Sequence, residues 1–258
     1  MARKSQKNSI YKRLFFWLLF INSFFIIYFI SQNQKWTSTI GLKIKTLFSE
    51  TNFPDGNYSY GIDVSEYQGV ISWNTIAQQK SNFKVSFVLI RSSAGKDHRD
   101  RYFTHNWRES KKNNLIRGAY HYYRPNENSS KQAQNFIANV KLQSGDLPPV
   151  LDVEQLSKVQ SMQSLKSGIK NWLNIIEEHY GIQPILYTGT HFYRDYLNDF
   201  KDYPIWIANY NNIENPLSEK EWIMWQFSDQ GQINGISGPV DLDLFNGNMK
   251  DLNKYLLK

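Results

Sequence analysis

The length and composition of the chain suit a single large folded domain. It has 258 residues, of which 41% are hydrophobic and 16% aromatic, enough for one large core. It has no cysteine, which excludes disulfides, thiolate metal sites and a cysteine nucleophile. Residues 1–50 carry a basic excess equal to the whole net charge of +7, so the charge does not indicate nucleic acid binding by the remaining residues.

The N-terminal residues have the pattern of a membrane anchor. An uncharged apolar run, residues 14–30, follows Lys12 and Arg13 and is just long enough to span a hydrocarbon core as a helix. The basic flank predicts that residues 1–13 are cytoplasmic and that everything after the span lies outside. A cleaved signal peptide is the alternative, but the following "SQNQKWTS" offers no small-x-small cleavage site. Residues 31–57 are polar, end in the turn-forming "NFPDGN" and are predicted to be a tether.

Residues 58–258 alternate short β-rich runs with segments that suit helices or loops. The clearest helices are expected at 129–141 and 161–180, whereas the segments 64–84 and 211–220 offer little helical pattern. Apolar strands that alternate with helices favour a parallel sheet, and eight strands are enough to close one. The sequence therefore predicts an α/β fold, a single (β/α)-type barrel that is partly helix-poor. Its strands are expected at 58–64, 85–92, 115–123, 148–154, 183–189, 203–210, 221–228 and 239–245.

Four carboxylates lie on these predicted strands. In "LPPVLDVEQL", Asp152 and Glu154 are two residues apart and so share a strand face, about 6.5 to 7 Å from each other. Asp63 ends the first strand, and Asp241 lies within the last. Barrel enzymes build their sites at the C-terminal ends of strands, so these side chains are predicted to converge. Any one of them could merely cap a turn, but four together favour a site.

Other chemistries find little support. "SAGKDH" lacks the upstream glycine of a phosphate loop and has no Ser or Thr after its lysine. The histidines lack the helical pair spacing of a metal site. We therefore expect no cofactor, no metal and no nucleic acid partner.

Several motifs together resemble the lysozymes of glycoside hydrolase family 25. In order, they are "YGIDVSEYQGVISW", "GAYHYYRP", "PPVLDVEQ", "WIANY" and "MWQFSDQGQINGISGPVDLDLF", and they cover residues 58 to about 246. The resemblance implies a flattened, partly helix-poor barrel that cuts the β-1,4 bond between N-acetylmuramic acid and N-acetylglucosamine in peptidoglycan. It places the family's catalytic carboxylates at Asp63, Asp152, Glu154 and Asp241.

The sequence departs from the family pattern at two positions. Ala94 stands where many members have a glutamate after the second strand, which affects local support or substrate contacts more than catalysis. Asp243 stands in place of the usual asparagine. If it is ionised close to the site, its charge would keep a catalytic acid protonated to higher pH; if a basic side chain pairs with it, it would have no such effect.

The chemistry of glycoside cleavage gives the two acids separate roles. Glu154 is expected to be the proton donor, with its pKa raised by Asp152 and by aromatic surroundings. The estimated spacing lies between those of retaining and inverting enzymes and does not decide the stereochemistry. A third route, favoured by the resemblance, uses the substrate's N-acetyl group as nucleophile and Asp152 to orient it.

Aromatic side chains on the strands are candidate sugar contacts, since such rings stack on pyranose faces. Each could instead belong to the barrel core, Trp206 above all, and Gln226 could bond either a sugar hydroxyl or a barrel neighbour. The candidate substrate-binding residues are Tyr120, Tyr122, Tyr187, Trp206, Trp225 and Gln226.

Two functions remain open at this point. The first is a membrane-tethered muramidase that acts on peptidoglycan strands outside the cytoplasm. The second is a non-catalytic glycan-binding module that has kept the barrel pocket. The complete carboxylate set favours the enzyme, because a pure binder gains nothing from keeping costly buried like charges.

Overall fold

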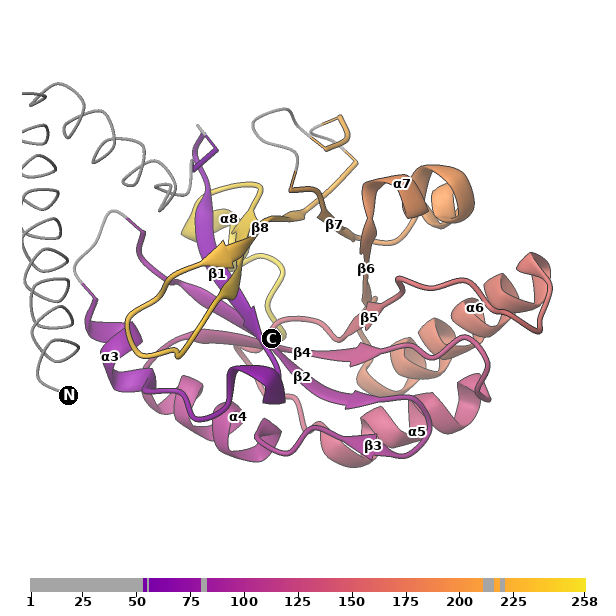
Figure 1. Cartoon of the computed structure of the whole chain (residues 1–258), viewed down its shortest axis with the longest axis horizontal. Helices are drawn as coiled ribbons and strands as arrows, with labels where there is room; N and C mark the ends of the chain where they lie inside the picture. The colour runs from indigo at the N-terminus through magenta and orange to yellow at the C-terminus, as the bar shows by residue number, and fades with distance from the viewer. Residues whose placement is uncertain (1–52, 55, 80–82, 211–215, 219–220) are drawn as a thin grey trace, which may run out of the picture. The chain divides into compact units, whose positions relative to one another are not determined.

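The structure is a computed structural model that describes residues 53–54, 56–79, 83–210, 216–218 and 221–258 (Figure 1). Phe53–Lys258 form one compact unit. The predicted span 14–30 and most of the predicted tether lie outside the described residues. Within the described part, no helix combines the length and the apolar character needed to cross a membrane.

Eight strands of the described residues close into a barrel. In sheet order they run β1-β9-β8-β7-β6-β5-β4-β2, and a pairing between β1 and β2 completes the ring. Each predicted strand is confirmed, within a few residues at its ends. The strands are β1 (Ser59–Val64), β2 (Phe87–Ala94), β4 (Ile116–Tyr122), β5 (Val150–Asp152), β6 (Ile185–Gly189), β7 (Ile205–Ala208), β8 (Met224–Gly231) and β9 (Val240–Phe245); the short β3 (His98–Arg99) pairs with β2 outside the ring.

The last strand corrects the prediction of a parallel sheet. Strands β1 to β8 of the ring pair in parallel, but β9 is antiparallel to both β8 and β1. In its register, Asp241 lies opposite Asp63, and Asp243 lies opposite both Gly61 and Gln226. The start of β9 therefore meets the C-terminal ends of the other strands. Asp241, the second residue of β9, reaches the predicted end of the barrel for this reason.

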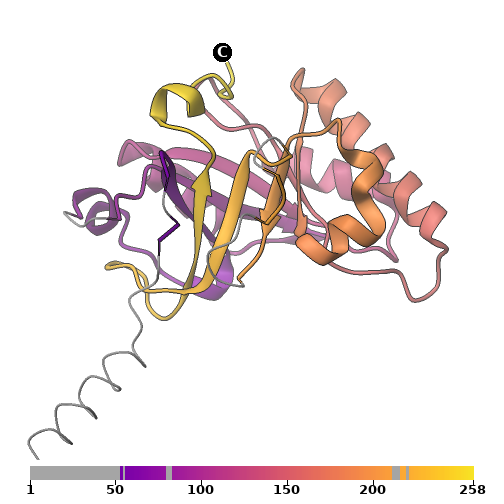
Figure 2. The ribbon, with the colours of Figure 1, turned by 90° about the horizontal axis from the view of Figure 1, so that it is seen from above.

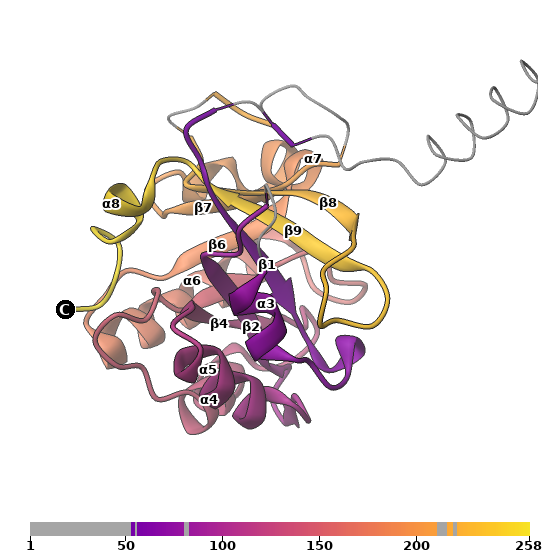
Figure 3. The same ribbon diagram turned by 90° about the vertical axis from the view of Figure 1, so that its left-hand side faces the viewer.

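The helices cover the barrel unevenly. The predicted helices are confirmed as α5 (Ser129–Asn139) and α6 (Met162–Tyr180); side chains of Asn128 and Ser161 cap their N-termini, and Gly181, with φ of 68°, ends α6. Together with α4 (Phe103–Lys112), they lie along one side of the barrel, away from β8 and β9 (Figure 1, Figure 3). No α-helix joins β8 to β9, a connection that the structure describes in full. The helix-poor connection is therefore not where it was expected: the segment 64–84 contains a 3-10 turn and a short α-helix, and most of 211–220 lies outside the described residues.

Shorter elements fill the remaining connections. The 3-10 turn η1 (Glu66–Gln68) and α3 (Trp73–Gln78) follow β1, and α8 (Met249–Leu252) follows β9. After β6 the chain forms α7 (Thr190–Phe192), which continues into the π-helix η2 (Tyr193–Leu197) and η3 (Asn198–Phe200) (Figure 2). The sequence patterns did not predict α4 or this segment after β6.

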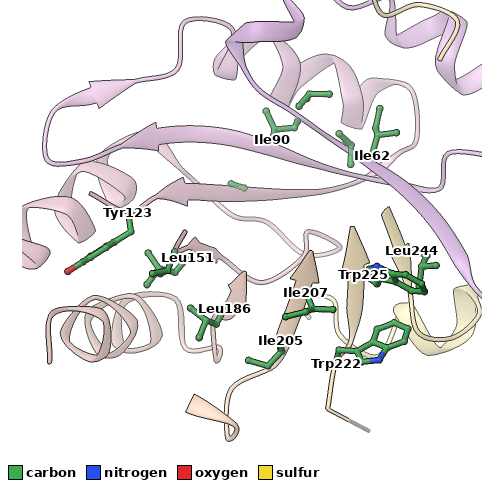
Figure 4. Packing of buried hydrophobic residues seen from close by; sticks show 14 of the residues in the cluster. Ile62, Ile90, Tyr123, Leu151, Leu186, Ile205, Ile207, Trp222, Trp225 and Leu244 are labelled. Atoms are coloured by element: carbon green, nitrogen blue, oxygen red, sulfur yellow. The ribbon is translucent and has the colours of Figure 1, made fainter. Parts of the chain in front are cut away.

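Two apolar layers result from the alternation of side chains along the strands. One layer packs the strands against the helices and includes Ile62, Leu151, Leu186 and Ile207 (Figure 4). The other fills the barrel interior and includes Phe87, Leu89, Val150, Ile185 and Met224. Strand residues next to those of the outer layer therefore point into the barrel, toward its apolar interior residues.

Candidate active site

The predicted carboxylates come together at one end of the barrel. Asp63 alternates with the outward-facing Ile62 and Val64, and Asp152 follows the outward-facing Leu151, so both acids point inward. Asp63 and Asp152 are each only 5% exposed. Burial raises the pKa of Asp63 well above its ordinary value, and the charges of its carboxylate neighbours raise it further. The largest of these charge effects comes from Asp241, opposite it on β9.

Gln226 orients Asp63. Its Nε2 donates to Oδ2 of Asp63 at 2.5 Å, and its Oε1 accepts from the hydroxyls of Tyr187 at 2.7 Å and Tyr210 at 2.5 Å. The amide of Gln226 thus bonds barrel neighbours, the second of the two roles considered for it. Tyr210 was not predicted as a site residue, although it is the last residue of the "WIANY" motif.

Asp152 and Glu154 occupy different depths. Burial raises the pKa of Asp152 well above its ordinary value, Glu154 raises it further, and Arg91 lowers it. Glu154 lies just beyond the end of β5 and is open to solvent at the cleft, but the surrounding walls still raise its pKa. Burial thus raises the pKa of both acids, and the two groups titrate as a pair.

Tyr187 joins Glu154 to the network of Gln226. Its hydroxyl has one proton, which it donates either to ionised Glu154 or to Gln226. When the proton goes to Gln226, the Tyr187 oxygen is free to accept one from protonated Glu154. The chain of contacts then runs from Glu154 through Tyr187 and Gln226 to Asp63.

Asp243 forms a buried carboxyl pair with Asp63. It is fully buried, and its Oδ1 accepts from Nε1 of Trp206 at 2.9 Å. Among the described residues its Oδ2 has no hydrogen-bond partner, and its charge raises the pKa of Asp63. Burial, and then Asp241, raise the pKa of Asp243 well above its ordinary value. No basic side chain of the described residues forms an ion pair with Asp243, so the expected alternative of a paired, electrostatically silent Asp243 is not supported.

The predicted sugar contacts divide into two groups. Trp225 is 2% exposed, belongs to the outer apolar layer, and donates from Nε1 to the carbonyl of Asn209. Neighbouring side chains on a strand point to opposite faces, and Gln226 points into the barrel, so Trp225 points out of it. The predicted sugar contact of Trp225 is therefore wrong. Trp206 points inward but is 1% exposed, and its role here is support of Asp243.

The tyrosines lie nearer to the carboxylates. Tyr120 is buried and packs against Trp206. Burial, and then the charges of Asp63 and Asp152, raise its pKa, so it belongs to the inner wall of the site. Tyr122 is half-buried; burial, and then Glu154, raise its pKa to about 12.

A pocket of about 500 Å³ opens beside Glu154. It is walled by strand ends β6 and β7 and by the helical segment that follows β6. Its lining combines aromatic rings and two acids, among them Glu154, Tyr187, Phe192, Asp195, Tyr196 and Tyr210. Phe192, Asp195 and Tyr196 were not predicted, because no pattern in the sequence indicates that the turn after β6 folds back over the barrel.

Arg91 is a second feature that the sequence patterns did not single out. On β2 it alternates with the interior residue Leu89, and its guanidinium bonds Glu66 and Asp100, each at 3.2 Å. Its charge lowers the pKa of Asp152. Ala94, at which the family resemblance leads one to expect a glutamate, is buried at the end of the same strand. Within the described range, no group of three or more His, Asp or Glu side chains is arranged to hold a metal ion.

Known proteins are similar to this chain in sequence and in fold. The family model of the glycosyl hydrolases family 25 matches residues 62–236. Curated relatives include the uncharacterised protein YegX of Escherichia coli K12, 39% identical over 76% of this chain and 73% of its own length. They also include the autolytic lysozyme of Clostridium acetobutylicum, 32% identical over 72% of this chain and 55% of its own length.

Solved structures of lysozymes superpose on the barrel. A family 25 glycosyl hydrolase from Bacillus anthracis matches with a TM-score of 0.73 and 29% identity, over 80% of this chain and 97% of that one. The bacterial lysozyme of Streptomyces coelicolor matches with a TM-score of 0.68 and 27% identity, over 78% and 98% of the two chains. The chain therefore belongs to the family 25 glycosyl hydrolases and is a glycoside hydrolase of the muramidase type.

Proposed function

We propose that the enzyme cleaves the β-1,4 bond between N-acetylmuramic acid and N-acetylglucosamine in peptidoglycan. The observation that carries this proposal is the convergence of Asp63, Asp152 and Asp241 in the barrel mouth, with Glu154 at the adjoining open pocket. Glycoside cleavage needs one carboxyl group that gives a proton and a second that supports the developing positive charge. Both kinds of environment, a solvent-facing acid and buried acids, occur here.

Glu154 is the proton donor in this mechanism. It lines the pocket where the pocket meets the end of β5, so a glycosidic oxygen can reach it there. The walls of the cleft raise its pKa, which keeps it protonated at a pH where an ordinary glutamate is ionised. Its proton goes to the leaving oxygen as the glycosidic bond breaks.

Asp152 orients the nucleophile. In the substrate-assisted route, the carbonyl oxygen of the substrate's N-acetyl group bonds to C1 as the leaving group departs. Asp152 accepts a hydrogen bond from the acetamido N–H, and this contact favours the ionised form of Asp152. The proton shared by the pair then resides on Glu154, where the reaction needs it. Water next attacks C1, opens the bicyclic intermediate and returns a proton to Glu154.

Asp63 and Asp241 supply negative charge from the paired strands β1 and β9. Asp63 is fixed by Gln226, so its charge needs no rearrangement as positive charge develops on the sugar. Burial, with Asp229 and Glu154, raises the pKa of Asp241 to about 6.

The membrane span predicted at residues 14–30 would place this domain outside the cytoplasm, next to the wall. We include this location in the proposal. It brings the barrel to its substrate and restricts cleavage to strands near the membrane.

Digestion of purified peptidoglycan tests the proposed bond. The full-length protein is expected to release fragments whose new reducing ends are N-acetylmuramic acid. New ends that are N-acetylglucosamine would assign a different glycosidic bond. Sedimentation with peptidoglycan without any new reducing ends would instead support the non-catalytic binding module.

A further inference from the structure

Tyr67 presents an aromatic ring to solvent at the rim of the site. It lies in η1, directly after β1 and four residues beyond Asp63. It is 82% exposed, the largest fraction among the exposed large apolar and aromatic residues of the described chain. Isolated exposed rings are common on proteins, so its exposure alone does not indicate a ligand. The contacts that hold Tyr67 in place and its position at the barrel mouth do indicate one.

The turn that carries Tyr67 is fixed by hydrogen bonds. Oγ of Ser65 accepts from the backbone N–H of Tyr67 at 3.3 Å, and Oε1 of Gln68 accepts from the backbone N–H of Ser65 at 2.9 Å. Oδ2 of Asp100 accepts from the backbone N–H of Glu66 at 2.7 Å. A ring held on such a turn loses little freedom when a ligand binds, which lowers the entropic cost of binding.

Arg91 contacts one face of the ring and connects it to the carboxylates. Its guanidinium carbon lies 4.8 Å from the centroid of the Tyr67 ring, a cation-π contact. The guanidinium is itself held by Glu66 and Asp100, and its charge acts on Asp152. Tyr67 is therefore supported from below by a buried cation of the site, while most of its surface stays open.

The ring and the pocket stand on opposite sides of the barrel mouth. In the closed ring of strands, β1 and β6 are four strands apart in either direction. Tyr67 follows β1, and the 500 Å³ pocket is built at the ends of β6 and β7. The inward-pointing Asp63 and Asp152 lie between them. An extended ligand that starts in the pocket and crosses the carboxylates is directed toward Tyr67.

We propose that Tyr67 is a sugar-stacking platform, on which an uncharged pyranose ring of the glycan strand rests at the end of the cleft opposite the pocket. The faces of a pyranose carry C–H groups and pack on aromatic rings. This inference rests on the proposed glycan cleavage and extends it, because it predicts that the enzyme favours strands long enough to span the mouth. Short fragments that fill only the pocket side gain nothing from the platform.

A length series of soluble glycan strands tests the platform. The full-length protein and its Tyr67→Ala and Tyr67→Phe variants are assayed on peptidoglycan tetrasaccharides and octasaccharides. We expect Tyr67→Ala to lower the octasaccharide-to-tetrasaccharide ratio of kcat/KM by about tenfold, mainly through KM on the longer substrate. Tyr67→Phe keeps the ring and is expected to keep most of the ratio. Tyr255→Ala, which removes a partly exposed ring from the C-terminal segment, is the matched control.

The outcomes separate this inference from the proposed function. If the unaltered protein cleaves both substrates but Tyr67→Ala leaves the length ratio unchanged, the platform is wrong and the proposed function stands. An equal loss on both substrates assigns Tyr67 a structural role and also overturns the platform. If the unaltered protein cleaves neither substrate, the proposed function fails, and the platform fails with it.

Discussion

At the scale of single residues, the site depends on how protons are shared among buried acids. The charge of Asp243 raises the pKa of Asp63, and the charge of Glu154 raises the pKa of Asp152. Burial raises the pKa of each of these groups, because water is excluded from around their charges. Because these acids interact, each apparent pKa describes a pair of groups and not a single residue. Contacts with the substrate then decide which member of a pair is protonated.

Glu154→Gln tests the proton donor. The amide preserves the size of the side chain but has no acidic proton, so we expect kcat on peptidoglycan to fall by about 10²- to 10⁴-fold. Glu178→Gln, an exposed position on α6, is the control and is expected to retain activity. Unaltered thermal unfolding would show that Glu154→Gln is folded. Turnover like that of the unaltered protein would remove Glu154 from the mechanism.

Asp152→Asn should also impair cleavage severely, for a different reason. The amide cannot carry the negative charge that orients the acetamido group and stabilises the reacting centre. The loss is expected in kcat with the fold retained, measured by the release of reducing ends. A rate within a few-fold of the unaltered protein would leave the substrate-assisted route without its orienting residue.

Asp243→Asn tests the carboxyl pair through the pH dependence of kcat/KM. The charge of Asp243 helps to raise the pKa of Asp63, and it is not among the groups that shift Glu154. Removing this charge lowers the pKa of Asp63. If Asp63 acts in its ionised form, the acid limb of the profile moves to lower pH, and the alkaline limb set by Glu154 stays in place. An unmoved acid limb would mean that Asp243 has no electrostatic role in the reaction.

At the scale of elements, the sequence predicted the positions of the strands better than their directions. Apolar alternation is a local property, so runs such as "PPVLDVE" and "VDLDLF" located β5 and β9 within a few residues. The antiparallel pairing of β9 depends on how the chain enters the last gap in the barrel, which no local pattern encodes. The same limit applies to the helical segment after β6. Its residues Phe192 and Tyr196 line the pocket because of tertiary packing.

Gly61→Ala tests the closure of the barrel at β1. A Cβ at this position would overlap the buried ring of Phe87 on β2. We expect overpacking to cost about 1 to 3 kcal/mol of unfolding free energy, which corresponds to a fall in Tm of roughly 2 to 10 °C. Gly189→Ala, where no atom of the described residues lies within 4 Å of the added Cβ, should change Tm much less. Equal Tm values for the two variants in a thermal melt would show that the Phe87 ring moves aside without cost.

At the scale of the whole molecule, the sequence motifs predicted the barrel. They also predicted that four acidic side chains would lie at one end of it. The pairing of Asp243 with Asp63, the Gln226 network and the outward face of Trp225 could not be predicted, since each depends on the register between strands distant in sequence. The charge distribution adds a constraint on this scale. The basic excess is confined to residues 1–50, so the barrel itself has little electrostatic attraction to an anionic membrane surface. The proposed membrane attachment therefore depends on the N-terminal residues.

Fractionation of cells that express the full chain tests this attachment. If residues 14–30 span the membrane uncleaved, the protein stays with membranes after a high-salt wash, has the full mass of 30.4 kDa, and exposes its C-terminus to protease from outside. Replacing Phe24 and Phe25 by arginine puts two charges within the run, at about 2.5 to 3.5 kcal/mol each, and should prevent insertion. The matched replacement of Gln32 and Asn33 by arginine lies outside the run and should leave insertion intact. A mature N-terminus anywhere after Ile30 would exclude the anchor, and the barrel would then act as a released enzyme.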